Sequence, residues 1–134
     1  MTSALVVVAT ILLAAAAAIH VFIFVLESIM WSRASTWRSF GVRSQTDADL
    51  IRPMAFNQGF YNLFLALGVT IGLGLATWPN LSQAGHAIAL FAAASMVAAA
   101  VVLISSSPRL ARAAAIQGVA PLAGIVLLAL GLAT

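Results

Sequence analysis

The sequence lacks cysteine and lysine, and only 7% of its 134 residues are charged. The absence of cysteine excludes disulfides, thiolate-bound zinc and thiol catalysis. A soluble domain of this size would have about a quarter of its residues charged, whereas 63% of this chain is hydrophobic. The composition is therefore that of a membrane protein, and the length predicts a single integral membrane domain over residues 1–134.

Four apolar runs are long enough to cross a bilayer core, which needs roughly 20 helical residues. They extend from about Ala4 to Trp31, Met54 to Trp78, Gly85 to Ile104 and Ala113 to Ala133. The first run resembles a signal peptide around Ala14 to Ala18, but no basic residue precedes it and it stays apolar through Leu26. We therefore predict an all-α membrane protein, a bundle of four transmembrane helices.

Arginine is confined to two of the connections between these runs. Residues 32–52 contain four arginines and residues 105–112 contain two, whereas the terminal segments and residues 79–84 contain none. Basic residues accumulate in cytoplasmic loops, so both termini should lie outside and both arginine-bearing loops inside. The net charge of +3 then reflects topology. We expect a multi-pass protein of the bacterial inner (plasma) membrane, in contact with the lipid bilayer and with no nucleic-acid partner.

The first arginine-bearing loop is long enough to contain structure of its own. Thr46 and Asp49 have the spacing of a capping box, in which two side chains satisfy the free N–H groups at a helix start. This spacing predicts a short interfacial helix from Asp47 toward Pro53. Alternatively, the second span starts early and bends at Pro53. Both alternatives place a short cytoplasmic interfacial segment between the first two spans.

Small residues should bring the spans into close contact. Gly68 and Gly72 form a small-xxx-small pair on the second span, the third span is mostly alanine, and Gly118 and Gly124 lie on the fourth. Lipid provides no hydrophobic drive for helices to associate, so close backbone approach matters. These residues are explained by packing alone.

Polar side chains inside the spans are the candidates for function, because an unpartnered polar group in hydrocarbon is costly. The candidate ligand-binding residues are His20, Glu27, Asn57, Gln58, Tyr61, Asn62 and Gln117. His20 and Glu27, seven residues apart on one helical face, are also the candidate catalytic residues. At about 1.5 Å per residue, most of these groups lie in the same half of the membrane. They predict a polar pocket between the first, second and fourth spans, open to the cytoplasm.

Each candidate also has a purely structural interpretation. The amides could serve as hydrogen-bond links between helices, each contributing about 0.6 kcal/mol. Glu27 could pair with Arg33 at the interface, and His20 could be a buried ring bonded to a neighbouring carbonyl. The sequence does not decide between these interpretations and a pocket.

The same residues resemble a known family pattern. It comprises His20, then Glu27 and Trp31, then Asn57-Gln58-Gly59-Phe60-Tyr61-Asn62, then Gln117-Gly118 and Pro121. This pattern is similar to the small four-span bacterial membrane proteins grouped as domain of unknown function 1304. The resemblance covers nearly the whole chain and implies the four-helix fold, but it brings no established activity.

Three functions fit this pattern. The pocket could bind, and in one version modify, a small amphipathic or lipid-like ligand, with His20 and Glu27 as acid–base groups; whether the protein is an enzyme stays open. The chain could instead be a non-catalytic accessory subunit of a larger membrane complex, or a homo-oligomer. A proton-coupled exporter is the third hypothesis, opposed by the arginine bias toward one fixed orientation. No metal site is predicted, and no cofactor is specified.

The topology can be tested directly. Reporter fusions at Thr134 and within residues 79–84 should both report an external location, because neither region contains a basic residue to retain it in the cytoplasm. A cytoplasmic C-terminus would contradict the predicted orientation, and with it the cytoplasmic opening of the pocket.

Overall fold

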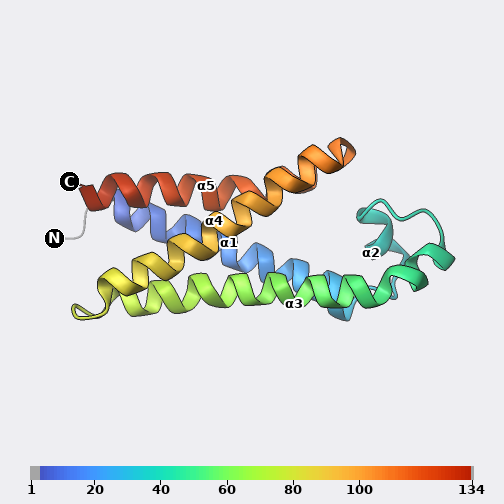
Figure 1. Ribbon diagram of the computed structural model, residues 1–134, viewed down its shortest axis with the longest axis horizontal. Helices are drawn as coiled ribbons and strands as arrows, with labels where there is room; N and C mark the ends of the chain where they lie inside the picture. Colours follow the sequence, from blue (N-terminus) through green and yellow to red (C-terminus); the bar gives the residue numbers. More distant parts are fainter. Residues whose placement is uncertain (1–3, 134) are drawn as a thin grey trace.

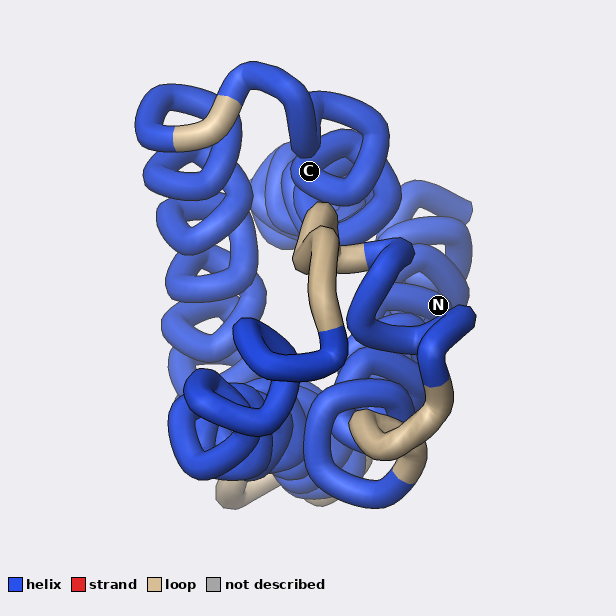
Figure 2. The backbone as a smooth tube through the Cα atoms, turned by 90° about the vertical axis from the view of Figure 1, so that its right-hand side faces the viewer, coloured by secondary structure: helices blue, strands red, loops and turns tan. Residues whose placement is uncertain are grey.

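A computed structural model describes residues 4–133, which form an all-helical bundle (Figures 1 and 2). The elements in chain order are α1 (Ala4–Phe24), a π-helical turn η1 (Val25–Ile29), α2 (Ala34–Ser39), α3 (Gln45–Ala76), α4 (Ser82–Ser106), a 3₁₀ turn η2 (Pro108–Leu110) and α5 (Ala111–Ala133). Four helical segments are long and apolar enough to cross a membrane, and no strand occurs within the described range. The predicted four-span helical bundle is confirmed; Thr134, the proposed fusion site, lies outside the described residues.

The four long helices pack in a ring. α1 contacts α3 and α5, and α4 contacts the same two helices from the opposite side. α1 begins and α5 ends at the end of the bundle where α3 turns into α4, whereas α2 and the α4–α5 corner lie at the other end (Figure 1). The two arginine-bearing connections therefore share one end of the bundle. That this end faces the cytoplasm stays a prediction.

The start of α3 distinguishes the two alternatives for the first loop. α3 begins at Gln45 and continues through Pro53 without a break, so the second span starts early and the separate helix from Asp47 toward Pro53 does not form. The residue that caps α3 is Ser44, which precedes Thr46, the first residue of the predicted capping box. Ser44 Oγ accepts a hydrogen bond from the Asp47 N–H (3.1 Å) and donates one to the Asp47 carboxylate (2.6 Å).

The interfacial segment is α2, and tryptophans connect it to α3. Trp37 is buried, and the Trp31 indole N–H donates a hydrogen bond to the Ala48 carbonyl at 2.9 Å. Both indoles pack with Ala48 and Ala55 of α3 in a small hydrophobic cluster. A buried indole usually finds an acceptor for its N–H. Trp31 has one, whereas the Trp37 N–H has no hydrogen-bond partner among the described residues.

Small residues close the bundle at the end that contains the α3–α4 turn. A Cβ at Gly72 would lie 2.5 Å from the backbone nitrogen of Ala89 and 2.7 Å from the carbonyl oxygen of Gly85. On the other side of the ring, a Cβ at Gly124 would lie 2.8 Å from the Leu13 side chain. α3 and α4 therefore touch through their backbones, and on α5 the missing side chain of Gly124 leaves room for Leu13 of α1, as the glycine pattern predicts.

Replacing Gly72 by Ala should lower the melting temperature, because the new methyl would meet backbone atoms that cannot rotate away. Overpacking of this kind typically costs about 1–3 kcal/mol. Gly74→Ala is the matched control: it lies on the same helix, and a Cβ there meets nothing within 4 Å. Thermal denaturation in detergent measures both variants. Equal melting temperatures would show that the α3–α4 contact does not depend on Gly72.

Candidate functional site

Glu27 lies in the π-helical turn that ends the first membrane span. The turn is closed by a hydrogen bond from the Met30 N–H to the Val25 carbonyl, at 2.9 Å. Such turns are rare, and they occur frequently at functional sites. The wider turn changes the angular register of the residues that follow α1. Within this turn Glu27 is buried, with 8% of its surface exposed.

Gly59 allows η1 to lie directly against α3. A Cβ at this position would overlap the Ser28 hydroxyl and would lie 3.1 Å from the Glu27 Cβ. The same contact is closed by a hydrogen bond of 2.8 Å from Ser28 Oγ to the Phe56 carbonyl. Gly59 therefore determines how close Glu27 can come to α3.

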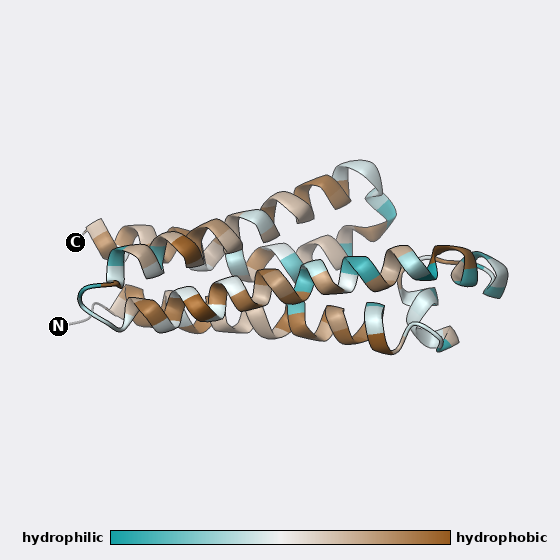
Figure 3. Cartoon of the chain, turned by 60° about the horizontal axis from the view of Figure 1, so that its bottom comes forward, coloured by the Kyte–Doolittle hydropathy of each residue, from teal (hydrophilic) through white to brown (hydrophobic). Residues whose placement is uncertain are grey.

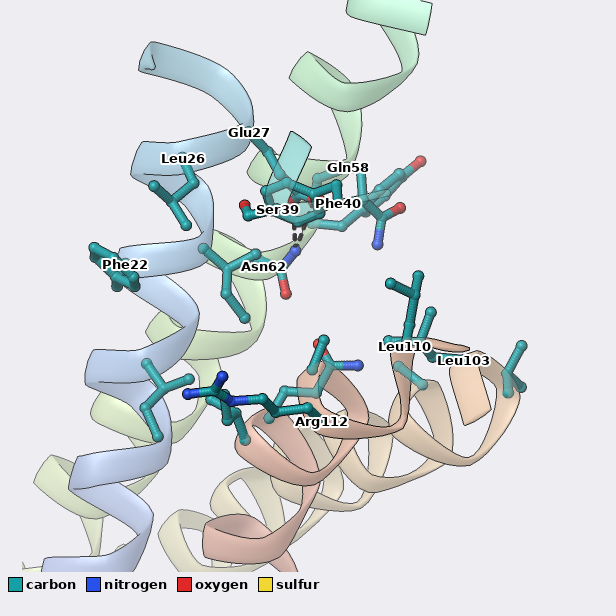
Figure 4. Close-up of a pocket in the computed structure, with 18 of the residues that line it drawn as sticks. Phe22, Leu26, Glu27, Ser39, Phe40, Gln58, Asn62, Leu103, Leu110 and Arg112 are labelled. Carbon is teal, nitrogen blue, oxygen red and sulfur yellow. Dashed lines mark hydrogen bonds between the residues drawn. The ribbon is translucent and has the colours of Figure 1, made fainter. Parts of the chain in front are cut away.

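Asn62 is the hydrogen-bond partner of the carboxylate. Its Nδ2 donates to Glu27 Oε2 at 2.9 Å, and to the Gln58 carbonyl at 3.1 Å (Figure 4). Asn62 is itself buried. The second bond holds the amide in place along its own helix, so Asn62 is oriented toward Glu27. Among the described residues, Oε2 is the only Glu27 oxygen with a hydrogen bond.

The carboxylate adjoins a cavity of about 810 Å³ between the helices. This volume falls in the range of about 300–1,000 Å³ that is typical of ligand pockets. Apolar side chains from all four long helices form most of the wall, and Figure 4 shows Glu27, Gln58 and Asn62 on one side of the opening and Arg112 on the other. The polar residues of the lining are Glu27, Ser39, Gln58, Tyr61, Asn62, Ser106, Arg109, Arg112 and Gln117.

Five of the seven candidate residues line this cavity, namely Glu27, Gln58, Tyr61, Asn62 and Gln117. Asn57 does not. Its side chain is exposed, because a helix turns about 100° per residue and Asn57 therefore projects from a different side of α3 than Asn62. The binding roles of all seven residues stay predictions.

His20 also lies outside the cavity lining. It is 1% exposed, and its Nδ1 donates a hydrogen bond of 2.9 Å to the Ala16 carbonyl, one helical turn earlier. His20 is thus a buried ring bonded to a neighbouring carbonyl, which was the structural alternative to a role in the pocket. The seven-residue spacing suggested a shared face with Glu27, but the π turn begins between the two residues and alters that register.

Two arginines of the cavity lining were not expected from the sequence. Arg109 and Arg112 line the opening, although their positions in a short loop assigned them only to topology. Within residues 4–133 neither arginine forms an ion pair with Glu27, and neither does Arg33. The same range contains no cluster of three His, Asp or Glu side chains that could hold a metal ion.

The four long apolar helices define a small multi-pass membrane protein. The family model described as "Protein of unknown function (DUF1304)" matches residues 12–129, and the chain belongs to this family. The resemblance drawn from the sequence motifs is thus confirmed. No curated protein and no solved structure matches the chain.

Because the chain has no cysteine, single cysteines can test whether water reaches the cavity. A thiol at position 117 should react with a hydrophilic maleimide, since Gln117 lines the cavity and the reactive thiolate forms only where water has access. Val119 is the control, as it lies two residues away on the outer surface of α5 with 62% exposure. Val119→Cys should stay unlabelled in the membrane. Equal labelling of Gln117→Cys and Val119→Cys would contradict a hydrated cavity.

Proposed function

We propose that this cavity binds a small amphipathic or lipid-like ligand. The ligand would enter the cavity from the cytoplasmic side of a bacterial inner membrane. The observation that supports this most directly is the position of Glu27. It is a buried carboxyl group within a membrane span, it has one amide partner, and it adjoins a large cavity with mostly apolar walls. Ionisable residues in membrane spans are costly, and they commonly mark binding sites or pathways.

The chemistry of the walls indicates the class of ligand. Binding pockets combine apolar walls, which bury hydrocarbon, with a few polar groups that orient the molecule. Here these polar groups include a carboxyl oxygen of Glu27 that has no hydrogen-bond partner among the described residues, and the amides of Gln58 and Gln117. A hydroxyl or amino group on the ligand would satisfy Glu27, while the apolar part of the ligand lies against side chains such as Phe22 and Leu103.

The position of His20 favours ligand binding over a reaction in which His20 and Glu27 act together as acid and base. General acid–base groups must come within hydrogen-bond reach of the reacting atoms. His20 is buried outside the cavity lining, and its Nδ1 bonds the Ala16 carbonyl of its own helix. The accessory-subunit hypothesis requires a surface that binds a partner protein. The exporter hypothesis requires a carboxyl group that can be reached from both sides of the membrane. No particular contact of Glu27 favours either hypothesis.

Filling the cavity should displace the ligand. Ala113 lines the cavity, so Ala113→Phe would place an aromatic ring inside it. Ala115 lies two residues along α5, is exposed and is outside the lining, which makes Ala115→Phe a matched control. Native mass spectrometry of protein purified in a mild detergent should detect a bound small molecule on the wild type and on Ala115→Phe, but not on Ala113→Phe.

Glu27→Gln extends the same measurement. It retains the size of the side chain and its bond to Asn62 through an oxygen, but removes the charge and the proton-accepting second oxygen. We expect weaker retention of the bound molecule at a nearly unchanged melting temperature. His20→Gln should retain the molecule. If the bound molecule is equally abundant on all four variants, it does not occupy this cavity.

A further inference from the structure

A second recess adjoins the cavity at the end of the bundle that contains the arginine-bearing loops. Its volume is about 470 Å³, and it is lined by Arg38, Ser39, Phe40, Gly41, Arg43, Ser107, Arg109 and Leu110. Three arginines from two connections distant in sequence thus meet around one hollow. Gly41 makes the turn between Arg38 and Arg43 possible, since its φ of 82° lies in the left-handed region that favours glycine.

The recess has an excess of positive charge. No acidic side chain is among its lining residues, and Arg38, Arg43 and Arg109 form no ion pair with any residue in the range 4–133. Arg38 has a cation–π contact with Trp37, at 5.1 Å from the ring centroid. The positive-inside rule accounts for arginines in both loops. It does not require that they line a common recess, so their convergence calls for a separate explanation.

The recess and the cavity are adjacent and share part of their walls. Ser39, Phe40, Arg109 and Leu110 line both. Figure 4 shows Phe40 and Leu110 on opposite sides of the opening, with Arg112 reaching from α5 at its margin. A molecule with its polar end among the arginines could therefore extend into the apolar cavity without leaving the protein. Glu27 and Asn62 lie deeper, on the α1–α3 side.

We propose that the ligand has a phosphate-type anionic head group, which the recess binds through Arg38, Arg43 and Arg109 while the cavity holds its hydrocarbon. The planar guanidinium group presents paired N–H donors that match phosphate oxygens. This assignment rests on the proposed function, because it names the class of amphiphile that the cavity would accept. Phosphate chemistry is shared by membrane lipids and by soluble anions, and the experiment separates the two sources.

The test titrates the purified full chain, in a neutral detergent, with dioleoyl phosphatidic acid and counts bound lipid by native mass spectrometry. The double variant Arg43→Gln/Arg109→Gln should bind phosphatidic acid at least about tenfold more weakly than the wild type. The reason is that losing charge-assisted hydrogen bonds to the phosphate lowers the affinity by about a factor of ten. Arg33→Gln/Arg52→Gln is the matched control, since it removes two arginines that line neither hollow. The control should bind like the wild type. Equal losses in both double variants would overturn the proposal, as would equal binding by all three proteins.

Two further probes identify which part of the argument fails. Dioleoylglycerol has the same chains without phosphate and should bind more weakly than phosphatidic acid. If dioleoylglycerol binds equally well and Ala113→Phe abolishes its binding, the cavity binds hydrocarbon as proposed but the assignment of an anionic head group is wrong. If inorganic phosphate binds as tightly as the lipid, the recess serves a soluble anion and the inference is overturned. Phosphatidic acid that binds Ala113→Phe as well as the wild type would refute the cavity as the hydrocarbon site, and with it the proposed function.

Discussion

The hydrogen bond between Asn62 and Glu27 is the interaction around which one half of this bundle is organised. A carboxyl group inside a membrane span must have a partner, and the amide of Asn62 provides it at 2.9 Å. The contact requires that η1 approach α3 closely, which only a residue without a side chain at position 59 permits. It also requires the π turn that directs Glu27 toward α3. The three features depend on one another, and together they form one wall of the cavity.

The two ends of the bundle are built differently, and the difference accounts for a cavity in so small a protein. At the end with the α3–α4 turn, Gly72 and Gly85 bring the backbones of α3 and α4 together. Toward the other end, the α4–α5 corner diverges from α1 and α3 (Figure 1). The polar bands of the helices lie mostly in this second half (Figure 3). Close packing at one end and divergence at the other thus produce an opening where the polar side chains are.

The arginines connect topology with the proposed recognition of a ligand. Basic loops orient a membrane protein. The two loops concerned lie at the same end of the bundle because two spans, an even number, separate them, whereas an odd number of spans separates each loop from either terminus. Once the loops are neighbours, Arg38, Arg43 and Arg109 can share a recess. A charge needed for insertion would then also select an anionic amphiphile, and Glu27 would distinguish among such molecules through their hydroxyl or amino groups.

The amino-acid sequence by itself determined the four spans, the presence of a segment between the first two spans, the placement of arginine in two connections and the family, because hydropathy, loop charge and motif spacing are local properties. The position of the helix in that segment, Ala34–Ser39, came only from the structure. The sequence also identified Glu27, Gln58, Tyr61, Asn62 and Gln117, since polar residues in apolar runs are conspicuous. Only the tertiary structure decided that Asn62 bonds Glu27, that His20 and Asn57 lie outside the cavity, and that Arg109 and Arg112 line it. These outcomes depend on the rotation and separation of helices distant in the chain. Contacts such as those of Gly59 with Ser28 and Gly72 with Ala89 set that geometry, and hydropathy and spacing along one chain do not encode it.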